Sequence, residues 1–156
     1  MSLEIRAAVP ADAGIIAGLA IALTNEIIER TGMRHFDLDR ADLEATCRRL
    51  MEQGAYAALL AQDSARVTGY AGMSVSHALY AGGTFGTVQE FYVVPEARSA
   101  GAGARLLDAV RDYGCAQGWT RLELCTPPLP EFERTLAFYE RNGFEVTGGR
   151  KMKATL

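Results

Sequence analysis

The sequence contains few cysteines and none of the spacings that bind metals or form disulfide frameworks. Its 156 residues include three cysteines, Cys47, Cys115 and Cys125, which are scattered and odd in number. No C-x-x-C pair occurs, so the sequence argues against a zinc site and against a disulfide-stabilised secreted domain. Scattered cysteines are typical of a reducing compartment. We therefore expect a cytoplasmic protein that binds no metal.

An excess of positive charge is also missing. Lysine and arginine together number 16 and aspartate and glutamate 19, which gives a net charge of −3. Without an overall basic field we expect no nucleic-acid partner. No uninterrupted apolar run approaches the roughly 20 residues that span a bilayer. Because the N-terminus also lacks a basic stretch followed by an apolar one, we expect neither a membrane span nor a secretory signal.

Length and composition are those of a globular protein with a single core. Apolar residues make up 49% and charged residues 22% of the chain, which is ordinary for a soluble globular protein. A chain of 156 residues is long enough to bury a substantial core. No internal repeat or low-complexity segment divides it. We expect one domain over residues 1–156.

The spacing of apolar residues predicts an α/β (α+β) fold. Strands are expected at 3–9, 55–61, 67–78, 84–94 and 120–126, helices at 10–32, 39–54, 104–117 and 131–142, and a closing hairpin at 144–147 and 151–154. Short turns join the middle strands, which predicts an antiparallel meander. A helix separates strands 84–94 and 120–126, so these two should be parallel. The expected sheet is mixed, mostly antiparallel and flanked by helices.

The stretch from Glu90 to Gln117 is typical of a phosphate-binding junction. An apolar strand passes through Pro95 into the small-residue run Ser99-Ala100-Gly101-Ala102-Gly103-Ala104 and then into an amphipathic helix. The first-turn N–H groups of a helix have no intrahelical partner, the helix dipole is positive there, and small side chains let a phosphate approach the backbone. A tight turn without a ligand is the alternative reading of this run.

Two known kinds of phosphate loop do not fit this stretch. A Walker loop ends in Gly-Lys-[Ser/Thr], and this chain contains no Gly-Lys pair. A dinucleotide fingerprint requires a third glycine three residues after the second, but Leu106 stands there, although Glu123 lies at a suitable distance further on. These absences disfavour a nucleotide- or dinucleotide-binding domain.

The longer pattern resembles the signature of the GCN5-related N-acetyltransferase (GNAT) superfamily. Val93-x-Pro95-x-x-Arg98-x-x-Gly101-x-Gly103 followed by a helix is similar to the family pattern [Arg/Gln]-x-x-Gly-x-[Gly/Ala]. Three other stretches resemble the family in the right order, and they are Ile5-Arg6-Ala7-Ala8-x-x-x-Asp12-Ala13, Val67-x-Gly69-Tyr70 and Leu136-Ala137-Phe138-Tyr139-Glu140-x-x-Gly143-Phe144. The resemblance covers nearly the whole chain and implies an N-acetyltransferase that depends on acetyl-coenzyme A (acetyl-CoA).

The resemblance also implies which residues hold acetyl-CoA. In the family, the strands that here end at Val94 and begin at Thr120 splay apart, and pantetheine adds in the gap like another strand. The backbone of Phe91, Tyr92 and Val93 would meet the pantetheine and acetyl end. The pyrophosphate would be held by Arg98, Ser99, Ala100, Gly101, Ala102, Gly103 and Ala104.

Direct transfer of the acetyl group to a primary amine is the implied reaction, with Tyr139 as the general acid. The family places this tyrosine four residues before the glycine of its last helix, and a positioned proton donor is typically worth about 10²–10⁴-fold in rate. Packing against Leu136 and Phe132 is the alternative role for Tyr139. Phe132 departs from the family, which often carries a cofactor-contacting asparagine there. A non-catalytic acyl-CoA-binding sensor is the alternative function.

Glu90 is the candidate general base. An amine with a lysine-like pKa of about 10.4 is mostly protonated at pH 7, so a carboxylate or a water chain must remove a proton. Family members often use a carboxylate on this strand. Strand alternation, however, places Glu90 opposite Val93 and groups Gln89 and Thr87 with Val93, unless a bulge shifts the register. A substrate-binding carboxylate and a surface charge are the other readings.

The acceptor amine is described by the sequence only as a class. The acidic balance mildly favours a cationic small molecule such as a polyamine, an aminoglycoside or a lysine side chain, and a peptide N-terminus fits as well. The resembling fold lines its acceptor pocket with the loop between the first two helices, which holds His35. Family members are often dimers, and the strands expected from Phe144 onward would offer an edge for a homodimer.

Overall fold

The computed structural model describes residues 2–34, 37–64 and 66–156. Its elements in chain order are β1 (Leu3–Ala7), η1 (Pro10–Asp12), α1 (Ala13–Thr31), α2 (Arg40–Glu52), β2 (Tyr56–Asp63), β3 (Arg66–Ala78), β4 (Gly83–Val93), η2 (Pro95–Ala100), α3 (Ala102–Gln117), β5 (Leu122–Leu124) and α4 (Glu133–Arg141). The expected pocket residue His35 lies outside the described residues. Two compact units divide the chain, residues 1–124 and residues 125–156, and each is described by itself.

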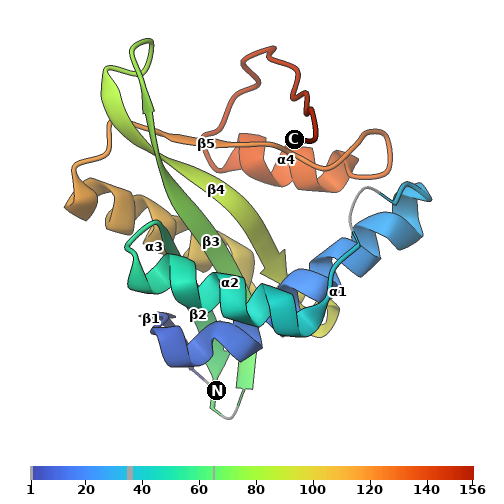
Figure 1. Ribbon diagram of the computed structural model, residues 1–156. Helices are drawn as coiled ribbons and strands as arrows, with labels where there is room; N and C mark the ends of the chain where they lie inside the picture. The colour runs from blue at the N-terminus through green and yellow to red at the C-terminus, as the bar shows by residue number, and fades with distance from the viewer. Residues whose placement is uncertain (1, 35–36, 65) are drawn as a thin grey trace. The chain divides into compact units, whose positions relative to one another are not determined.

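The first unit is built on a five-stranded sheet with the order β1-β2-β3-β4-β5 (Figure 1). The strands β1 to β4 pair with their neighbours antiparallel, and β5 pairs parallel with β4. The predicted meander and the predicted parallel strand are both confirmed. The parallel direction follows from α3, because a helix between two neighbouring strands returns the chain to the end at which the first strand began.

Helices cover both faces of this sheet. The core between α3 and the sheet is formed by buried residues of both, namely Leu59, Ala71, Met73, Val88, Val93, Ala102, Leu106 and Val110. The core between the sheet and helices α1 and α2 is formed in the same way by Ala13, Ile16, Cys47, Ala58, Leu60, Tyr70 and Tyr92. Each large apolar side chain buried in this way contributes roughly 1.5–3 kcal/mol. Because both faces of β4 are covered, its backbone is held firmly from above and below.

One segment of the first unit is long and apolar enough to cross a membrane by length and composition alone. It is Pro10–Thr31, which comprises η1 and α1. This criterion does not test the expectation that the chain has no membrane span, which stays a prediction. The measure is weak, because core helices of soluble proteins meet it too, and Ala13, Ile16 and Ala17 of this segment are buried in the first unit.

The second unit contains α4 and otherwise irregular chain. Gly143, with φ of 89°, follows the helix in the left-handed conformation that the sequence predicts for a helix end. Residues 144–156 form no strand, so the predicted closing hairpin is wrong, and with it the edge expected for a homodimer. Residues 145–156 are all exposed, and a two-stranded hairpin without a buried face is only marginally stable.

A bidentate ion pair fixes the start of α1. Arg6 Nη1 and Nη2 donate to Asp12 Oδ2 and Oδ1, each at 2.9 Å, and the backbone N–H of Val9 donates to Asp12 Oδ2 at 2.8 Å. The Asp12 side chain is only 11% exposed. The hydrogen bond from Arg6 holds the pKa of this carboxyl below its usual value. The pair therefore joins β1 to the first helical turn.

We predict that Asp12→Asn lowers the free energy of unfolding at pH 7 by about 1–3 kcal/mol, because hydrogen bonds to a charged group are lost. Since the pKa of Asp12 is lower in the folded state, the stabilisation is present above the unfolded value of about 3.9 and disappears as pH falls through the folded value. Urea unfolding at a series of pH values measures this.

The matched control for this prediction is Asp39→Asn. Asp39 caps α2 by accepting the backbone N–H of Asp42 at 2.9 Å, and asparagine caps a helix about as well as aspartate does. The control should change stability little at any pH. A loss in Asp12→Asn that stayed the same down to low pH would contradict the role assigned to the ion pair.

Candidate active site

The candidate site is built on β4, whose two neighbouring strands pair with it over different lengths. On one side β4 pairs with β3 from Gly83 to Val93. On the other side it pairs with β5 only from Gly86 to Val88, opposite Leu122–Leu124. Pairing with β5 therefore stops at Val88, although β4 continues to Val93. The parallel strands therefore pair at one end only, which fits the splay that the family resemblance implies.

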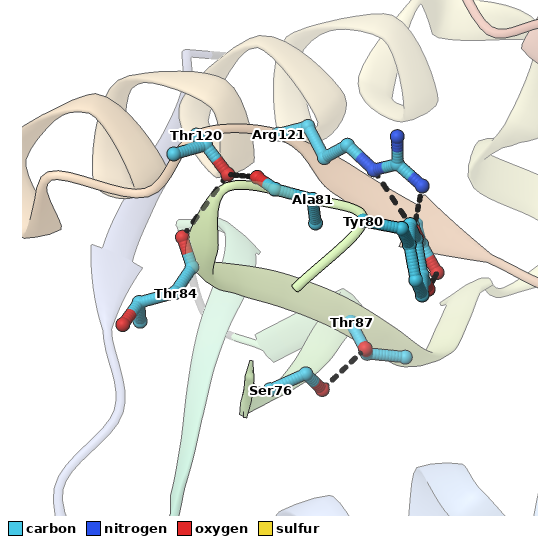
Figure 2. A network of polar contacts seen from close by, with 8 residues as sticks. Ser76, Tyr80, Ala81, Thr84, Thr87, Thr120 and Arg121 are labelled. Carbon is cyan, nitrogen blue, oxygen red and sulfur yellow. Dashed lines mark hydrogen bonds and ion pairs between the residues drawn. The ribbon is translucent and has the colours of Figure 1, made fainter. Parts of the chain in front are cut away.

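A polar network lies at the end where β4 and β5 pair (Figure 2). The Thr120 hydroxyl donates to the carbonyl oxygens of Ala81 at 2.8 Å and Thr84 at 3.2 Å. Beside it the Arg121 guanidinium carbon lies 4.8 Å from the centroid of the Tyr80 ring. Sequence reasoning did not predict these contacts, because the hairpin tip and the residues before β5 meet only in the folded chain. The network fixes the start of β5 beside β4, and the pairing of the two strands ends at Val88.

A bulge interrupts β4 just after its pairing with β5 ends. Gly72 of β3 lies opposite Glu90, whereas the next residue, Met73, lies opposite Val88. Gln89 is therefore an additional residue on the β4 side. Such a bulge reverses the alternation of side chains on either side of it.

The bulge changes which residues of β4 share a face. Val88 and Val93 both pack in the core under α3, although five positions separate them. Thr87, next to Val88, therefore lies on the face covered by α1 and α2, and the expectation that it shares the face of Val93 is wrong. Glu90 lies on the opposite face from Val93, as simple alternation predicts, because no irregularity falls between them.

Glu90 is held by a tyrosine from another strand. The hydroxyl of Tyr56, on β2, donates to Glu90 Oε1 in a short hydrogen bond. Burial, followed by the nearby charge of Glu90, raises the pKa of Tyr56, so the phenol remains a proton donor at neutral pH. Sequence reasoning did not identify Tyr56, because 34 positions separate it from its partner and nothing local marks the contact.

The junction after β4 has the geometry predicted for an anion site. The chain passes through η2 (Pro95–Ala100), reaches Gly101 in the left-handed conformation with φ of 77°, and enters α3 at Ala102. The first turn of α3 contains no acidic residue. Residues 99–101 are exposed. The positive end of the α3 dipole therefore faces an accessible loop of small residues.

Arg98 packs back onto the end of β4. Its Nε donates to the carbonyl oxygen of Val93 at 2.8 Å, and its Nη2 donates to Glu26 Oε1 of α1 at 2.6 Å. The guanidinium carbon lies 5.5 Å from the centroid of the Tyr92 ring. The structure thus brings together three of the predicted cofactor-binding residues, Tyr92, Val93 and Arg98, and adds Glu26, which the sequence did not indicate.

Tyr139 belongs to the second unit and is buried there. Its side chain packs edge-on against the rings of Phe138 and Phe144, with centroids 5.4 Å and 5.7 Å away. Burial raises the pKa of its hydroxyl, so the phenol is protonated at neutral pH. A buried, protonated tyrosine is suited both to packing and to proton donation.

Sequence comparison identifies the class of protein to which this architecture belongs. The sequence model of the acetyltransferase (GNAT) domain matches residues 54–146. An uncharacterized N-acetyltransferase, YhfO, from Bacillus subtilis (strain 168) is 30% identical over 119 residues, which are 74% of this chain and 78% of YhfO. The chain belongs to the GNAT acetyltransferase family. It is an acetyltransferase that uses acetyl-CoA as its donor.

Solved structures share the same fold. The integron cassette protein HFX_CASS3 from the mobile metagenome of Cole Harbour Salt Marsh matches with a TM-score of 0.79, covering 97% of this chain and 90% of its own, at 24% identity. The aminoglycoside N-acetyltransferase AAC(6')-Iy in complex with CoA matches with a TM-score of 0.79, covering 99% and 95%, at 18% identity. At these identities the likeness establishes the fold alone, and it confirms the predicted mixed sheet with flanking helices.

We predict that Gly101→Ala lowers the free energy of unfolding by about 1–2 kcal/mol, because a left-handed backbone is unfavourable for residues with a Cβ. A Cβ at this position would meet nothing within 4 Å, so a steric clash would not be the cause. Gly101→Asn should lose less, since asparagine tolerates this conformation better. Urea unfolding of both variants checks the prediction, and equal losses would contradict it.

Proposed function

We propose that the protein transfers the acetyl group of acetyl-CoA directly to a primary amine of a small cationic molecule. The observation that carries the proposal is the course of β4. This strand leaves its parallel neighbour after Val88, carries Glu90 beyond that point, and leads into the small-residue loop at the start of α3. Donor binding and proton removal are thereby assigned to one strand.

The donor would lie along the open side of β4. Pantetheine has amide groups that can join a strand edge as another strand would, and the backbone of Phe91, Tyr92 and Val93 continues beyond the pairing with β5. The pyrophosphate would lie at the positive end of α3. The residues assigned to it are Arg98, Ser99, Ala100, Gly101, Ala102, Gly103 and Ala104.

The reaction would proceed in one displacement with three proton transfers. Glu90, directly or through water, takes a proton from the ammonium group of the acceptor. The neutral amine attacks the thioester carbonyl, a C–N bond forms, the C–S bond breaks, and the nitrogen releases its second proton to water to give the amide. Coenzyme A leaves as a thiolate, to which Tyr139 gives its proton. The raised pKa of Tyr139 supports this role, since it keeps the phenol protonated until the thiolate forms.

An aminoglycoside-like polyamine is the acceptor class that we propose. One protein with the same fold, AAC(6')-Iy, is an aminoglycoside N-acetyltransferase. The net charge of −3 also favours a cationic acceptor over an anionic one. A panel of aminoglycosides, polyamines and peptide amines tests the assignment, with free-thiol release as the readout. Turnover of peptide N-termini alone would reject the small-molecule class.

Tyr139→Phe should lower kcat by about 10²–10⁴-fold and leave the Kd for acetyl-CoA nearly unchanged, because only the proton donor to the leaving thiolate is removed. Free-thiol release measures kcat, and calorimetric titration measures Kd. Tyr113→Phe is the matched control, since Tyr113 of α3 packs edge-on against Trp119 at 5.5 Å between centroids.

Wild-type turnover in Tyr139→Phe would reject the general-acid role. Acetyl-CoA binding by the wild-type protein without thiol release for any amine of the panel would instead favour an acyl-CoA-binding sensor.

Glu90→Gln should lower kcat/KM at neutral pH by about 10²–10⁴-fold and remove the ascending limb of its pH profile, because glutamine cannot accept the proton. Glu52→Gln, which removes an exposed carboxylate at the end of α2, is the control for the change of charge. An ascending limb of unchanged position and height in Glu90→Gln would show that another group is the base.

A further inference from the structure

We propose that Tyr56 is a positioning residue for Glu90, and that Gly72 provides the space in which the two side chains meet. The proposal rests on the role of Glu90 as the general base. In it, the Tyr56 hydroxyl fixes one carboxylate oxygen and keeps the carboxylate deprotonated at neutral pH, while the other oxygen takes the proton from the acceptor.

The contact is made across an intervening strand. Tyr56 on β2 lies opposite Ser74 of β3, and Glu90 on β4 lies opposite Gly72 of the same strand. Both side chains must therefore lean over β3 to form the hydrogen bond from the Tyr56 hydroxyl to Glu90 Oε1. Such a contact requires that the residue beneath it have no side chain.

Gly72 meets this requirement. A Cβ added there would overlap both the Tyr56 hydroxyl oxygen and Glu90 Oε1, and it would lie 2.7 Å from Tyr56 Cζ. Real Cβ atoms essentially never approach other heavy atoms so closely. The glycine at position 72 is thus explained by the contact above it, and the two together form one unit with Glu90.

The titratable groups that surround Glu90 are neutral at pH 7. Tyr56, Tyr70 and Cys47 face it from β2, β3 and α2. Burial raises the pKa of both phenols and, to about 11, that of the Cys47 thiol, whose neighbour Arg48 acts in the opposite direction. All three are neutral at pH 7. From α1 the cluster receives apolar side chains, namely Ala13, Ile16, Leu19, Ala20, Ala22 and Leu23.

A hydrogen bond donated to a carboxylate favours its charged form. It lowers the pKa of the carboxyl, and it opposes the upward shift that burial would cause. Without the Tyr56 hydroxyl, Glu90 would keep its proton to a higher pH and would no longer be fixed in one orientation. A smaller fraction of the enzyme would then be competent at neutral pH, although the base itself would still be present.

Tyr70 provides a matched control. It is fully buried in the same cluster, on the strand between Tyr56 and Glu90. Among the residues that the structure describes, its hydroxyl has no hydrogen-bond partner. Tyr70→Phe therefore removes the same atom type from the same surroundings without removing a hydrogen bond to Glu90.

The test compares the pH profiles of kcat/KM for the wild type, Tyr56→Phe, Tyr70→Phe and Glu90→Gln. In Tyr56→Phe the ascending limb should move upward by about one pH unit, the shift expected for losing a hydrogen bond to a charged group. Tyr70→Phe should keep the limb at its wild-type position, and Glu90→Gln should lack it. Near-ultraviolet circular dichroism establishes that each variant is folded.

The outcomes separate the two proposals. If Glu90→Gln lacks the limb and Tyr56→Phe leaves it in place, the positioning role is wrong and the base role stands. An equal shift in Tyr56→Phe and Tyr70→Phe also overturns the positioning role, because loss of any buried hydroxyl would then suffice. A limb that persists in Glu90→Gln overturns the base role itself.

A measurement independent of activity, and of any Tyr56 variant, uses carbon NMR on the wild-type protein. The Cζ resonance of Tyr56 should follow the titration of the Glu90 carboxyl carbon with the same midpoint, because the hydroxyl is bonded to that group. Glu90→Gln should abolish this response and assigns the carboxyl resonance. A Tyr56 resonance that stays flat while Glu90 titrates overturns the proposal.

Discussion

The pairing of β4 with β5 at one end only is the constraint on which the site depends. The Thr120 hydroxyl and the backbone of the β3–β4 hairpin hold the start of β5, so parallel pairing begins at Gly86. Pairing with β5 ends at Val88, whereas β4 continues to Val93 and leads to the loop before α3. A sheet that closed fully at this point would offer no edge to an extended ligand. In the proposed reaction, the donor would lie along β4 beyond this fixed end.

Beyond the bulge at Gln89, regular alternation places Glu90 and Val93 on opposite faces of β4. Val93 lies in the core under α3, which anchors the strand as it enters the small-residue loop before α3. Glu90 is turned toward the face covered by α1 and α2, where Tyr56 holds it above Gly72. In the proposed reaction, neighbouring residues would thus present backbone groups to the donor and a carboxylate to the acceptor. The same strand positions both substrates' reacting ends in the proposed reaction.

Much of the fold was predictable, because its cues are local. Apolar spacing, the turns between the middle strands and the glycine at position 101 each reflect a preference within a few residues. The same local reasoning failed for the closing hairpin. Apolar and polar residues alternate over 144–147 and 151–154 as they would in a strand, but residues 145–156 are all exposed and bury no apolar face. Local reasoning failed also for the face of Thr87, since a bulge depends on how β4 is matched to β3 and not on the composition of β4.

By itself the sequence determined the order of the elements, the direction of β5, the small-residue loop at the start of α3, and Glu90 and Tyr139 as candidates. These follow from preferences and motifs that lie within short stretches. Only the tertiary structure decided how far β5 pairs, where the bulge falls, and that Tyr56 is the partner of Glu90. The physical reason is that hydrogen bonds between strands and contacts such as that above Gly72 join residues far apart in the chain. Their geometry exists only once the sheet has formed.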